Sequence, residues 1–335
     1  MGSAMSYPAR ERDHEVRLVG TPLDRAIIDE AAGTEVHKYL KRRLPAGIKY
    51  FQIEDLGKAL AGADLLISGV SSFGVDWFTE EVLPVVPESL PILSVTKGMQ
   101  DTPDGELIPY PWLYKSRLGE KKLSINAVGG PCTSYELVDG DPTEICFCGD
   151  DILILRKLKS WLETSCYYIS LSTDVMGVEC AVALKNAYAL GVCLAVGLSE
   201  VREGVEGKLH YNSQAALFGQ SIKEMRRILA LFGCRDENIV FGAGDLYVTV
   251  FGGRTRLIGS LLGRGVSIDK AMEELKGITL ESIVIAKRTA AAIRKQIAKN
   301  SAKAEDFPLL LHIDDIITNG APVKIPWMNF VSEMV

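Results

Sequence analysis

The chain has 335 residues, of which 47% are hydrophobic and 24% charged, and its formal net charge is −6. This composition is typical of a globular protein with room for two domains. The acidic balance argues against nucleic acid or an anionic membrane as the main partner, so an anionic ligand would need locally gathered cations. The seven cysteines and four histidines follow no metal or disulfide spacing, which predicts reduced thiols and no metal site.

The opening stretch MGSAMSYPARERDHE lacks the long apolar core of a signal peptide, and we expect a cytoplasmic protein. Its small residues, followed by a predicted helix over 3–12, look like the end of a glycine-rich dinucleotide fingerprint with Gly2 as the last glycine. The alternative is that the opening MGS resembles the end of this fingerprint only by chance. On the first interpretation the first strand is missing, and we expect the natural reading frame to extend upstream.

Strand-like and helix-like segments alternate up to about residue 170. Strands are predicted at 14–20, 48–52, 64–72, 91–98, 123–131, 143–149 and 166–172, and helices at 23–33, 54–63, 76–86 and 152–163. Apolar strands between helices indicate a parallel, doubly wound, Rossmann-like α/β sheet. Helices then dominate, at 175–198, 211–231, 256–262, 268–275, 281–297 and 308–318. We therefore predict a dinucleotide-binding domain over 1–173 and an all-α substrate domain over 174–335.

A lysine stands in the middle of the most apolar helix, GVECAVALKNAYALGVCLAVGL. A buried lysine is costly unless it is paired or functional. The alternative is a purely structural lysine whose ammonium reaches solvent or forms a salt bridge. Its neighbours at helical spacing cannot pair with an ammonium: they are Val178, Ala181, Val182, Tyr188, Ala189 and Val192. Lys185 is therefore the leading candidate for a catalytic residue.

Three further stretches carry chemical groups. SVTKGMQ places Lys97 at the carboxyl end of an apolar strand, where open α/β sheets bind ligands. VGGPCTS ends another strand with a turn that lets the backbone approach a ligand. GAGDLYVTVFGGRTR supplies Asp245, Thr249, Arg254, Thr255 and Arg256 in a glycine-rich frame. Taken singly, these features also fit a solvated strand end, a helix cap and a surface pair of arginines.

In combination these blocks resemble the NAD(P)-dependent glycerol-3-phosphate dehydrogenase family, from about His14 to Pro322. The resemblance is carried by ADLLISGVSS, SVTKG, GGPCTSYELVDGDPT, DVMGVECAVALKNAYALGVCLAVGL, GAGDLYVT, GGRTR and FPLLLHIDDIITNGAPV. It implies hydride transfer between a nicotinamide and the secondary carbon of glycerol 3-phosphate or dihydroxyacetone phosphate. It also implies NAD or NADP as cofactor, a small phosphorylated substrate and a homodimer, without a nucleic-acid or membrane partner.

The resemblance assigns roles to residues of this chain. Lys185 resembles the general acid/base, Lys97 the lysine that holds the substrate oxygen, and Asp245 the acid that orients the lysine. The implied substrate-binding residues are Lys97, Gly130, Cys132, Asn186, Thr249, Arg254 and Thr255. The implied cofactor-binding residues are Met1, Gly2, Thr21, Ser72, Phe73, Lys97, Ser134, Arg254 and Glu281.

Departures from the family pattern cluster at the phosphate end of the site. Thr255 replaces an asparagine, Cys132 replaces a small polar residue or asparagine, and Ser282 replaces a glycine. They leave two alternatives open: a relative acting on another phosphorylated ketose or polyol, or a non-catalytic relative in view of the incomplete fingerprint. The choice between NAD and NADP is also open. Thr21 follows the strand predicted at 14–20, which is the second strand of the fold if the first is missing, and an acid at this place would favour NAD. Arg25 is a candidate for reaching a 2′-phosphate.

Overall fold

The structure is a computed structural model that describes residues 1–331 and divides into two compact units. The first unit comprises 1–97 and 110–175, and the second comprises 98–109 and the chain from Met176 onward. The predicted division at residue 173 therefore needs a correction for the segment 98–109. This segment belongs to the second unit because Met99 and Leu107 are buried in the core of its helices.

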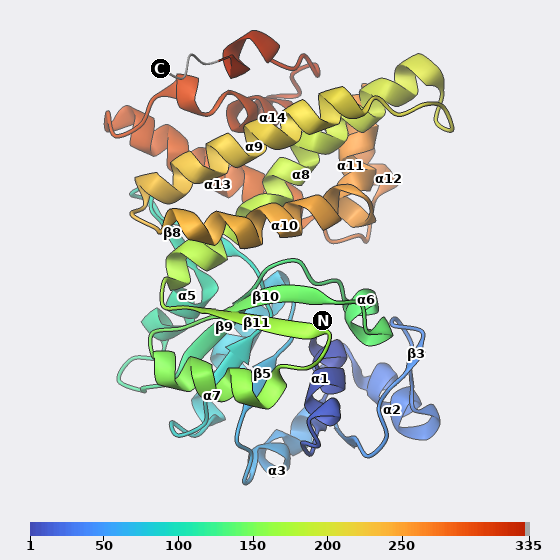
Figure 1. Ribbon diagram of the computed structural model, residues 1–335, viewed down its shortest axis with the longest axis vertical. Coiled ribbons are helices and arrows are strands. Elements are labelled where there is room, and N and C mark those ends of the chain that lie inside the picture. Colours follow the sequence, from blue (N-terminus) through green and yellow to red (C-terminus); the bar gives the residue numbers. More distant parts are fainter. Residues whose placement is uncertain (332–335) are drawn as a thin grey trace. The chain divides into compact units, whose positions relative to one another are not determined.

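The first unit is built on a five-stranded sheet with the order β11-β10-β9-β6-β5 (Figure 1). Its strands are β5 (Leu66–Ser68), β6 (Ile92–Ser94), β9 (Ile125–Gly129), β10 (Thr143–Cys148) and β11 (Tyr167–Ser172). Neighbouring strands are parallel, as predicted, except β9 and β10, which pair antiparallel. The connection between these two holds only the short helix α6, and a parallel return needs a longer crossover.

A second parallel pair, β1 (Arg17–Val19) and β4 (Lys49–Phe51), forms a separate sheet within the described residues. Two short hairpin strands, β2 (Val36–His37) and β3 (Arg42–Arg43), follow the second helix. The helices of this unit are α1 (Ser6–Glu11), α2 (Arg25–Thr34), α3 (Leu56–Leu60), α4 (Val75–Trp77), α5 (Tyr110–Arg117), α6 (Ser134–Asp139) and α7 (Ile152–Leu162).

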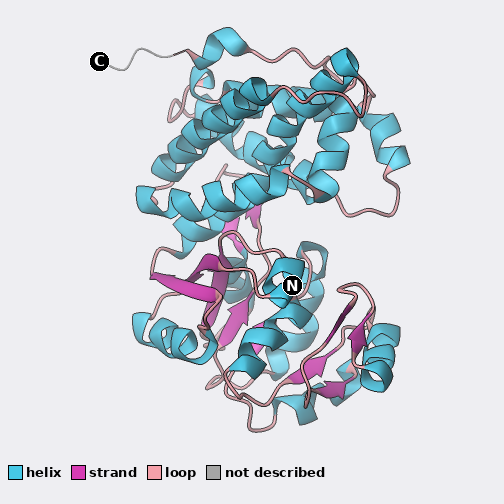
Figure 2. Cartoon of the chain, turned by 45° about the vertical axis from the view of Figure 1, so that its right-hand side comes forward, coloured by secondary structure: helices cyan, strands magenta, loops and turns pink. Residues whose placement is uncertain are grey.

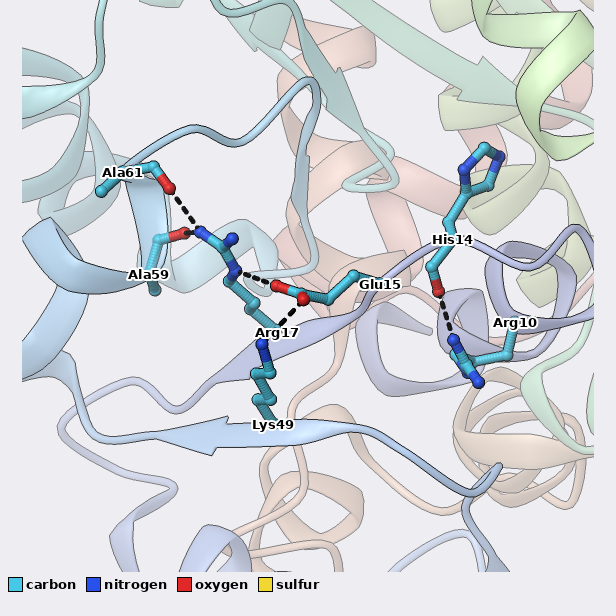
Figure 3. Close-up of polar contacts among 7 residues, drawn as sticks. All are labelled: Arg10, His14, Glu15, Arg17, Lys49, Ala59 and Ala61. Atoms are coloured by element: carbon cyan, nitrogen blue, oxygen red, sulfur yellow. Dashed lines mark hydrogen bonds and ion pairs between the residues drawn. The ribbon is translucent and has the colours of Figure 1, made fainter.

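Charged contacts fasten the β1–β4 pair to α3 (Figure 3). The Arg17 guanidinium donates to the carbonyl oxygens of Ala59 and Ala61 at 2.9 and 2.6 Å. Carbonyls at the end of a helix lack intrahelical partners and carry partial negative charge, so a cation stabilises them. The Glu15 carboxylate accepts from both Arg17 and Lys49 at 2.7 Å. These bonds hold β1, and with it the loop that follows it, in place.

The second unit is helical apart from the strands β7 (Met99–Asp101) and β8 (Leu107–Pro109) (Figure 2). Its helices are α8 (Val175–Glu203), α9 (Tyr211–Leu231), α10 (Ile239–Val250), α11 (Gly253–Gly263), α12 (Ile268–Glu274), α13 (Glu281–Ala298) and α14 (Pro308–Asn319). In the described chain, α8 alone is long and apolar enough to cross a membrane, and nearly all of its most apolar window is buried inside the protein. It is therefore placed as the core helix of this unit.

Helix α10 was not predicted, because Gly242, Gly244 and Asp245 suggest a turn rather than a helix. The structure gives Gly242 a packing role. A Cβ at this position would lie 2.6 Å from the carbonyl oxygen of Ala181, which is on α8. The glycine therefore lets α10 approach α8 closely enough for their polar side chains to meet.

Candidate active site

In the first unit, several predicted residues follow the carboxyl ends of parallel strands. Ser72 and Phe73 come after β5, Lys97 after β6, and Gly130 after β9. Strands that run parallel end at the same edge, so this chain gathers these residues at one edge of the sheet. That edge is where open α/β sheets bind their ligands.

Lys97 and the turn after β9 contact each other directly. The Lys97 Nζ donates to the carbonyl oxygen of Gly130 at 2.7 Å. Gly130 has φ +117°, and a Cβ there would lie 3.0 Å from the Cα of Ile145, so a larger residue would displace the turn. Cys132 lies in the same turn. A small recess is lined by Lys97, Gly130 and Cys132 together with Met1, Val95, Val128 and Tyr167.

The turn leads directly into helix α6. Thr133 is its N-cap: the hydroxyl accepts from the Glu136 amide and donates to the Glu136 carboxylate at 2.7 Å. Such a cap satisfies a free amide in the first turn of a helix and stabilises it. Ser134, a predicted cofactor contact, is the first residue of α6 and is held in place by this cap.

Two glycines bring separate loops together at the same edge. A Cβ on Gly2 would lie 2.9 Å from the Cα of Gly69, and a Cβ on Gly69 would lie 2.4 Å from the Cα of Gly2. The segment Gly2–Met5 thus passes against the loop after β5 in a way that no larger residue permits. This close approach of two backbones is the structural reason for a glycine at position 2.

The loop after β1 contains a carboxylate that the sequence analysis missed. Asp24 Oδ2 accepts from the Thr21 amide and hydroxyl at 3.1 and 2.6 Å. The Arg25 guanidinium forms an ion pair with Glu54. The only sequence signal for Asp24 was its place a few residues beyond Gly20, just outside the expected position. An acid therefore lies where the loop after β1 leads into α2, and it accepts hydrogen bonds from Thr21, the predicted cofactor contact.

In the second unit, Lys185 of α8 meets Asp245 of α10. The Lys185 Nζ and Asp245 Oδ1 are 2.5 Å apart, and the two side chains are 14% and 2% exposed. A buried pair with a short, charge-assisted hydrogen bond is held firmly in one geometry. The lysine in the apolar helix thus has a charged partner, and its side chain keeps a small exposed fraction.

Two other predicted residues lie next to this pair on the same helices, Asn186 on α8 and Thr249 on α10. Asn186 follows Lys185 on α8 and is almost fully buried. Thr249 lies one turn after Asp245, and its hydroxyl donates to the Asp245 carbonyl oxygen at 2.7 Å. This bond leaves the lone pairs of the hydroxyl free to accept from a ligand. Asn186 and Thr249 therefore place polar groups on the two helices that carry the ion pair.

Helix α11 begins in the glycine-rich stretch. Its N-cap is Gly252, which offers no side chain, so the first amides have no side-chain acceptor. Within residues 1–331 the exposed Arg254 forms no hydrogen bond or ion pair, and Thr255 is buried beside it. Arg256 instead donates to the Val250 carbonyl oxygen at 2.9 Å and so has a structural role. Free amides, a helix dipole and an arginine together suit a phosphate.

Helix α13 begins at Glu281, the predicted cofactor-contacting glutamate. Ser282 follows it and is 1% exposed, with no hydrogen-bond partner for its hydroxyl in the described chain. No group of three or more histidine, cysteine, aspartate or glutamate side chains among residues 1–331 could hold a metal ion. Groups of this kind suit an organic ligand with phosphate and hydroxyl groups.

Comparison with known proteins decides the family. The N-terminal model of NAD-dependent glycerol-3-phosphate dehydrogenase matches residues 1–152, and its C-terminal model matches 174–327. The NADP(+)-dependent glycerol-3-phosphate dehydrogenase of Archaeoglobus fulgidus is 33% identical over 282 residues, which cover 82% of this chain and 81% of that protein. The chain belongs to the NAD-dependent glycerol-3-phosphate dehydrogenase family. The resemblance stated from the sequence motifs is confirmed.

Other members of the family are also similar to this chain in sequence and in structure. The glycerol-3-phosphate dehydrogenase [NAD(P)+] of Acidobacterium capsulatum is 29% identical over 298 residues, covering 87% of this chain and 84% of that protein. The solved structure of the Plasmodium falciparum enzyme has a TM-score of 0.83 at 20% identity, covering 100% and 93% of the two chains. That of Coxiella burnetii has a TM-score of 0.77 at 21% identity, covering 98% and 95%. These structures confirm the predicted fold.

Proposed function

We propose that this protein interconverts glycerol 3-phosphate and dihydroxyacetone phosphate with NAD or NADP. The observation that carries the proposal is the Lys185–Asp245 pair, a positioned ammonium in an apolar helix. Family membership supports the reaction class, and the relatives matched are glycerol-3-phosphate dehydrogenases that use NADP or NAD(P). A family member that had lost catalysis would gain nothing from a lysine among apolar side chains.

The proposed mechanism assigns the proton to Lys185. In the reduction, its ammonium donates a proton to the carbonyl oxygen of dihydroxyacetone phosphate, and in the oxidation its amine takes the proton of the C2 hydroxyl. Asp245 holds the nitrogen in place and compensates its charge. Bound NAD(P)H supplies the hydride in the reduction. Lys97 holds the substrate oxygen through its own ammonium.

The phosphate is assigned to the start of α11. Arg254 is exposed and its guanidinium suits a bidentate contact, and the amides and dipole at the start of the helix favour an anion there. Thr255 can add a hydroxyl donor. The residues at the carboxyl edge of the sheet suit the cofactor: Thr21, Ser72 and Ser134 offer hydroxyls, and the Gly2–Gly69 contact keeps the loops close.

The test is a spectrophotometric assay of NADH and NADPH oxidation with dihydroxyacetone phosphate. We expect turnover with it, and a lower kcat/KM with longer ketose phosphates. A higher kcat/KM with a longer ketose phosphate would instead favour the relative suggested by Thr255 and Cys132. Absence of turnover with every ketose phosphate, in a protein that binds NADH in a calorimeter, would contradict the proposal.

The carboxylate of Asp24 makes a prediction about cofactor choice. Asp24→Asn removes a negative charge at the end of β1, where the 2′ group of the adenosine ribose binds in such sheets. We expect the ratio of kcat/KM for NADPH to that for NADH to rise roughly tenfold, because a carboxylate repels a 2′-phosphate. Asp64→Asn, at the opposite end of β5, is the matched control. Equal ratios in the two variants would rule out contact between Asp24 and the ribose.

We also propose a homodimer in the cytoplasm, as family resemblance suggests. The seven cysteines, all among the described residues, form no disulfide, which suits a reducing compartment. Sedimentation equilibrium of the purified protein tests the first statement: a mass twice that of the chain supports it, and the mass of one chain contradicts it. Cell fractionation tests the second.

A further inference from the structure

The segment after Lys97 forms a hairpin that is built into the helical unit. Strands β7 and β8 pair from Met99↔Pro109 to Asp101↔Leu107, and the turn between them closes with bonds between Thr102 and the residues before β8. Met99 is fully buried and Leu107 is 3% exposed, both in the core of the second unit. The hairpin is therefore an integral part of that unit rather than a surface loop.

One face of α13 binds this hairpin through side-chain hydrogen bonds. Its side chains donate to four hairpin carbonyls: Arg288 to Met99 at 2.9 Å, Lys295 to Thr102 at 2.8 Å, Gln296 to Gly105 at 3.0 Å and Lys299 to Asp104 at 2.7 Å. Positions 288, 292, 295, 296 and 299 recur at helical spacing and form one stripe. At Ala292 the stripe needs no side-chain donor, because Gly105 approaches the backbone of α13 there.

The first and last of these donors contact different parts of the hairpin. Arg288 holds the base, at Met99, two residues after Lys97, whereas Lys299 holds the tip at Asp104. Between Lys97 and Met99 stands only Gly98, with φ +153°, a conformation that other residues rarely adopt. Lys97 belongs to the first unit and Gly98 to the second. The Lys97 Nζ bonds the Gly130 carbonyl oxygen, and the backbone that follows Lys97 is anchored on α13 two residues later.

We propose that Arg288 is a positioning residue for Lys97. It fixes the Met99 carbonyl on α13, and with it the backbone from which Lys97 reaches the substrate. The same helix begins at Glu281, so one rigid element carries both the anchor of Lys97 and the proposed cofactor contact. This inference rests on the proposed function for the role of Lys97, but the anchor itself can be tested without turnover.

The experiment compares Arg288→Met with Lys299→Met in the full chain. Both variants remove one cationic donor from α13 to a hairpin carbonyl, at the base and at the tip respectively. Two readouts are taken. The first is kcat and KM for dihydroxyacetone phosphate; the second is the rate at which acetic anhydride acylates Lys97, followed by peptide mass spectrometry in the absence of substrate and cofactor. Arg288→Lys, which keeps a donor, is the rescue variant.

We expect Arg288→Met to lower kcat/KM for dihydroxyacetone phosphate roughly tenfold or more, because misplacing a binding group by a fraction of an ångström weakens the reacting geometry. The KM for NADH should stay unchanged. Lys97 should be acylated several-fold faster than in the wild type, and Arg288→Lys should restore both readouts in part. Lys299→Met should stay within about twofold of the wild type, as a surface change does.

Equal effects of Arg288→Met and Lys299→Met on the acylation of Lys97 would overturn the inference, because the base of the hairpin would then have no special influence on Lys97. If the wild type did not turn over dihydroxyacetone phosphate, the proposed function would fail, and the acylation rates alone would decide the positioning role. A fall in kcat/KM without faster acylation would also overturn it, since Arg288 would then act in some way other than through Lys97.

Discussion

Replacing Lys185 with methionine is expected to lower kcat roughly 10²- to 10⁴-fold, the usual contribution of a positioned general acid/base. Methionine keeps the length and the apolar character of the lysine stem, so the packing of α8 survives. What is lost is the ammonium that bonds Asp245. Steady-state kinetics with dihydroxyacetone phosphate and NADH measure the effect, with the exposed Lys270→Met as the matched control.

The variant also leaves the Asp245 carboxylate buried without its cation, which by itself costs stability. The double variant Lys185→Met/Asp245→Asn separates the two effects because it removes both charges. We expect it to regain thermal stability but not turnover. If turnover returned with stability, Lys185 would have a structural role only, and the general acid/base would have to be sought elsewhere.

Replacing Glu224 with alanine is expected to destabilise the second unit by roughly 3–6 kcal/mol, since each buried donor left unsatisfied costs about 1–3 kcal/mol. The Glu224 carboxylate is fully buried and accepts from the amides of Leu309 and Leu310 at 2.8 and 2.9 Å. It also accepts from Tyr188 on α8 and Gln220 on α9. Glu224 therefore caps the start of α14 and links α8, α9 and α14. Urea unfolding of the wild type and of Glu224→Ala measures the difference in the free energy of unfolding.

Glu224 also makes the stability of the protein depend on pH. Burial raises the pKa of this carboxyl to about 7, against the lowering effect of the hydrogen bonds from Gln220, Leu309, Leu310 and Tyr188. Between pH 4.5 and 7 the folded chain holds a proton that the unfolded chain has released. The stabilisation linked to this group is therefore complete below pH 4.5 and is lost as the pH rises through 7.

The matched variant for this pH effect is Glu224→Gln, which keeps an acceptor and cannot titrate. Across that range the free energy of unfolding of the wild type should fall relative to that of the variant by up to about 3 kcal/mol. Parallel pH profiles for the two proteins would show that Glu224 keeps the same protonation state in the folded and unfolded chains.

Much of the fold follows from local patterns. Apolar strands between amphipathic helices predict the first unit, and the long apolar helix predicts α8, because both signals lie within one element. Helix α10 and the hairpin 98–109 were missed for the opposite reason. The glycines of α10 act in packing against α8, and the short strands β7 and β8 are stabilised by donors from α13, almost 200 residues away in the chain.

The residues of the candidate site also divide into those with a local sequence signal and those that depend on contacts between distant segments. Lys185 stands out in the sequence because a charge conflicts with its apolar surroundings, and its partner Asp245 was expected from the family motif. Asp24 and Arg288 stand out only in three dimensions, because their importance comes from the backbone groups they contact. Glu224 is one of many glutamates in the sequence, and its burial depends on three separate helices meeting around it.

The most direct test of hydride transfer uses NADH carrying deuterium at the transferable position of C4, with dihydroxyacetone phosphate as the acceptor. We expect the wild type to form glycerol 3-phosphate with deuterium at C2, and Lys185→Met to form it far more slowly. Mass spectrometry and proton NMR of the product locate the label. Unlabelled product, or labelled product formed equally fast by Lys185→Met, would contradict the claim that this chain transfers hydride to the ketone with Lys185 as its acid.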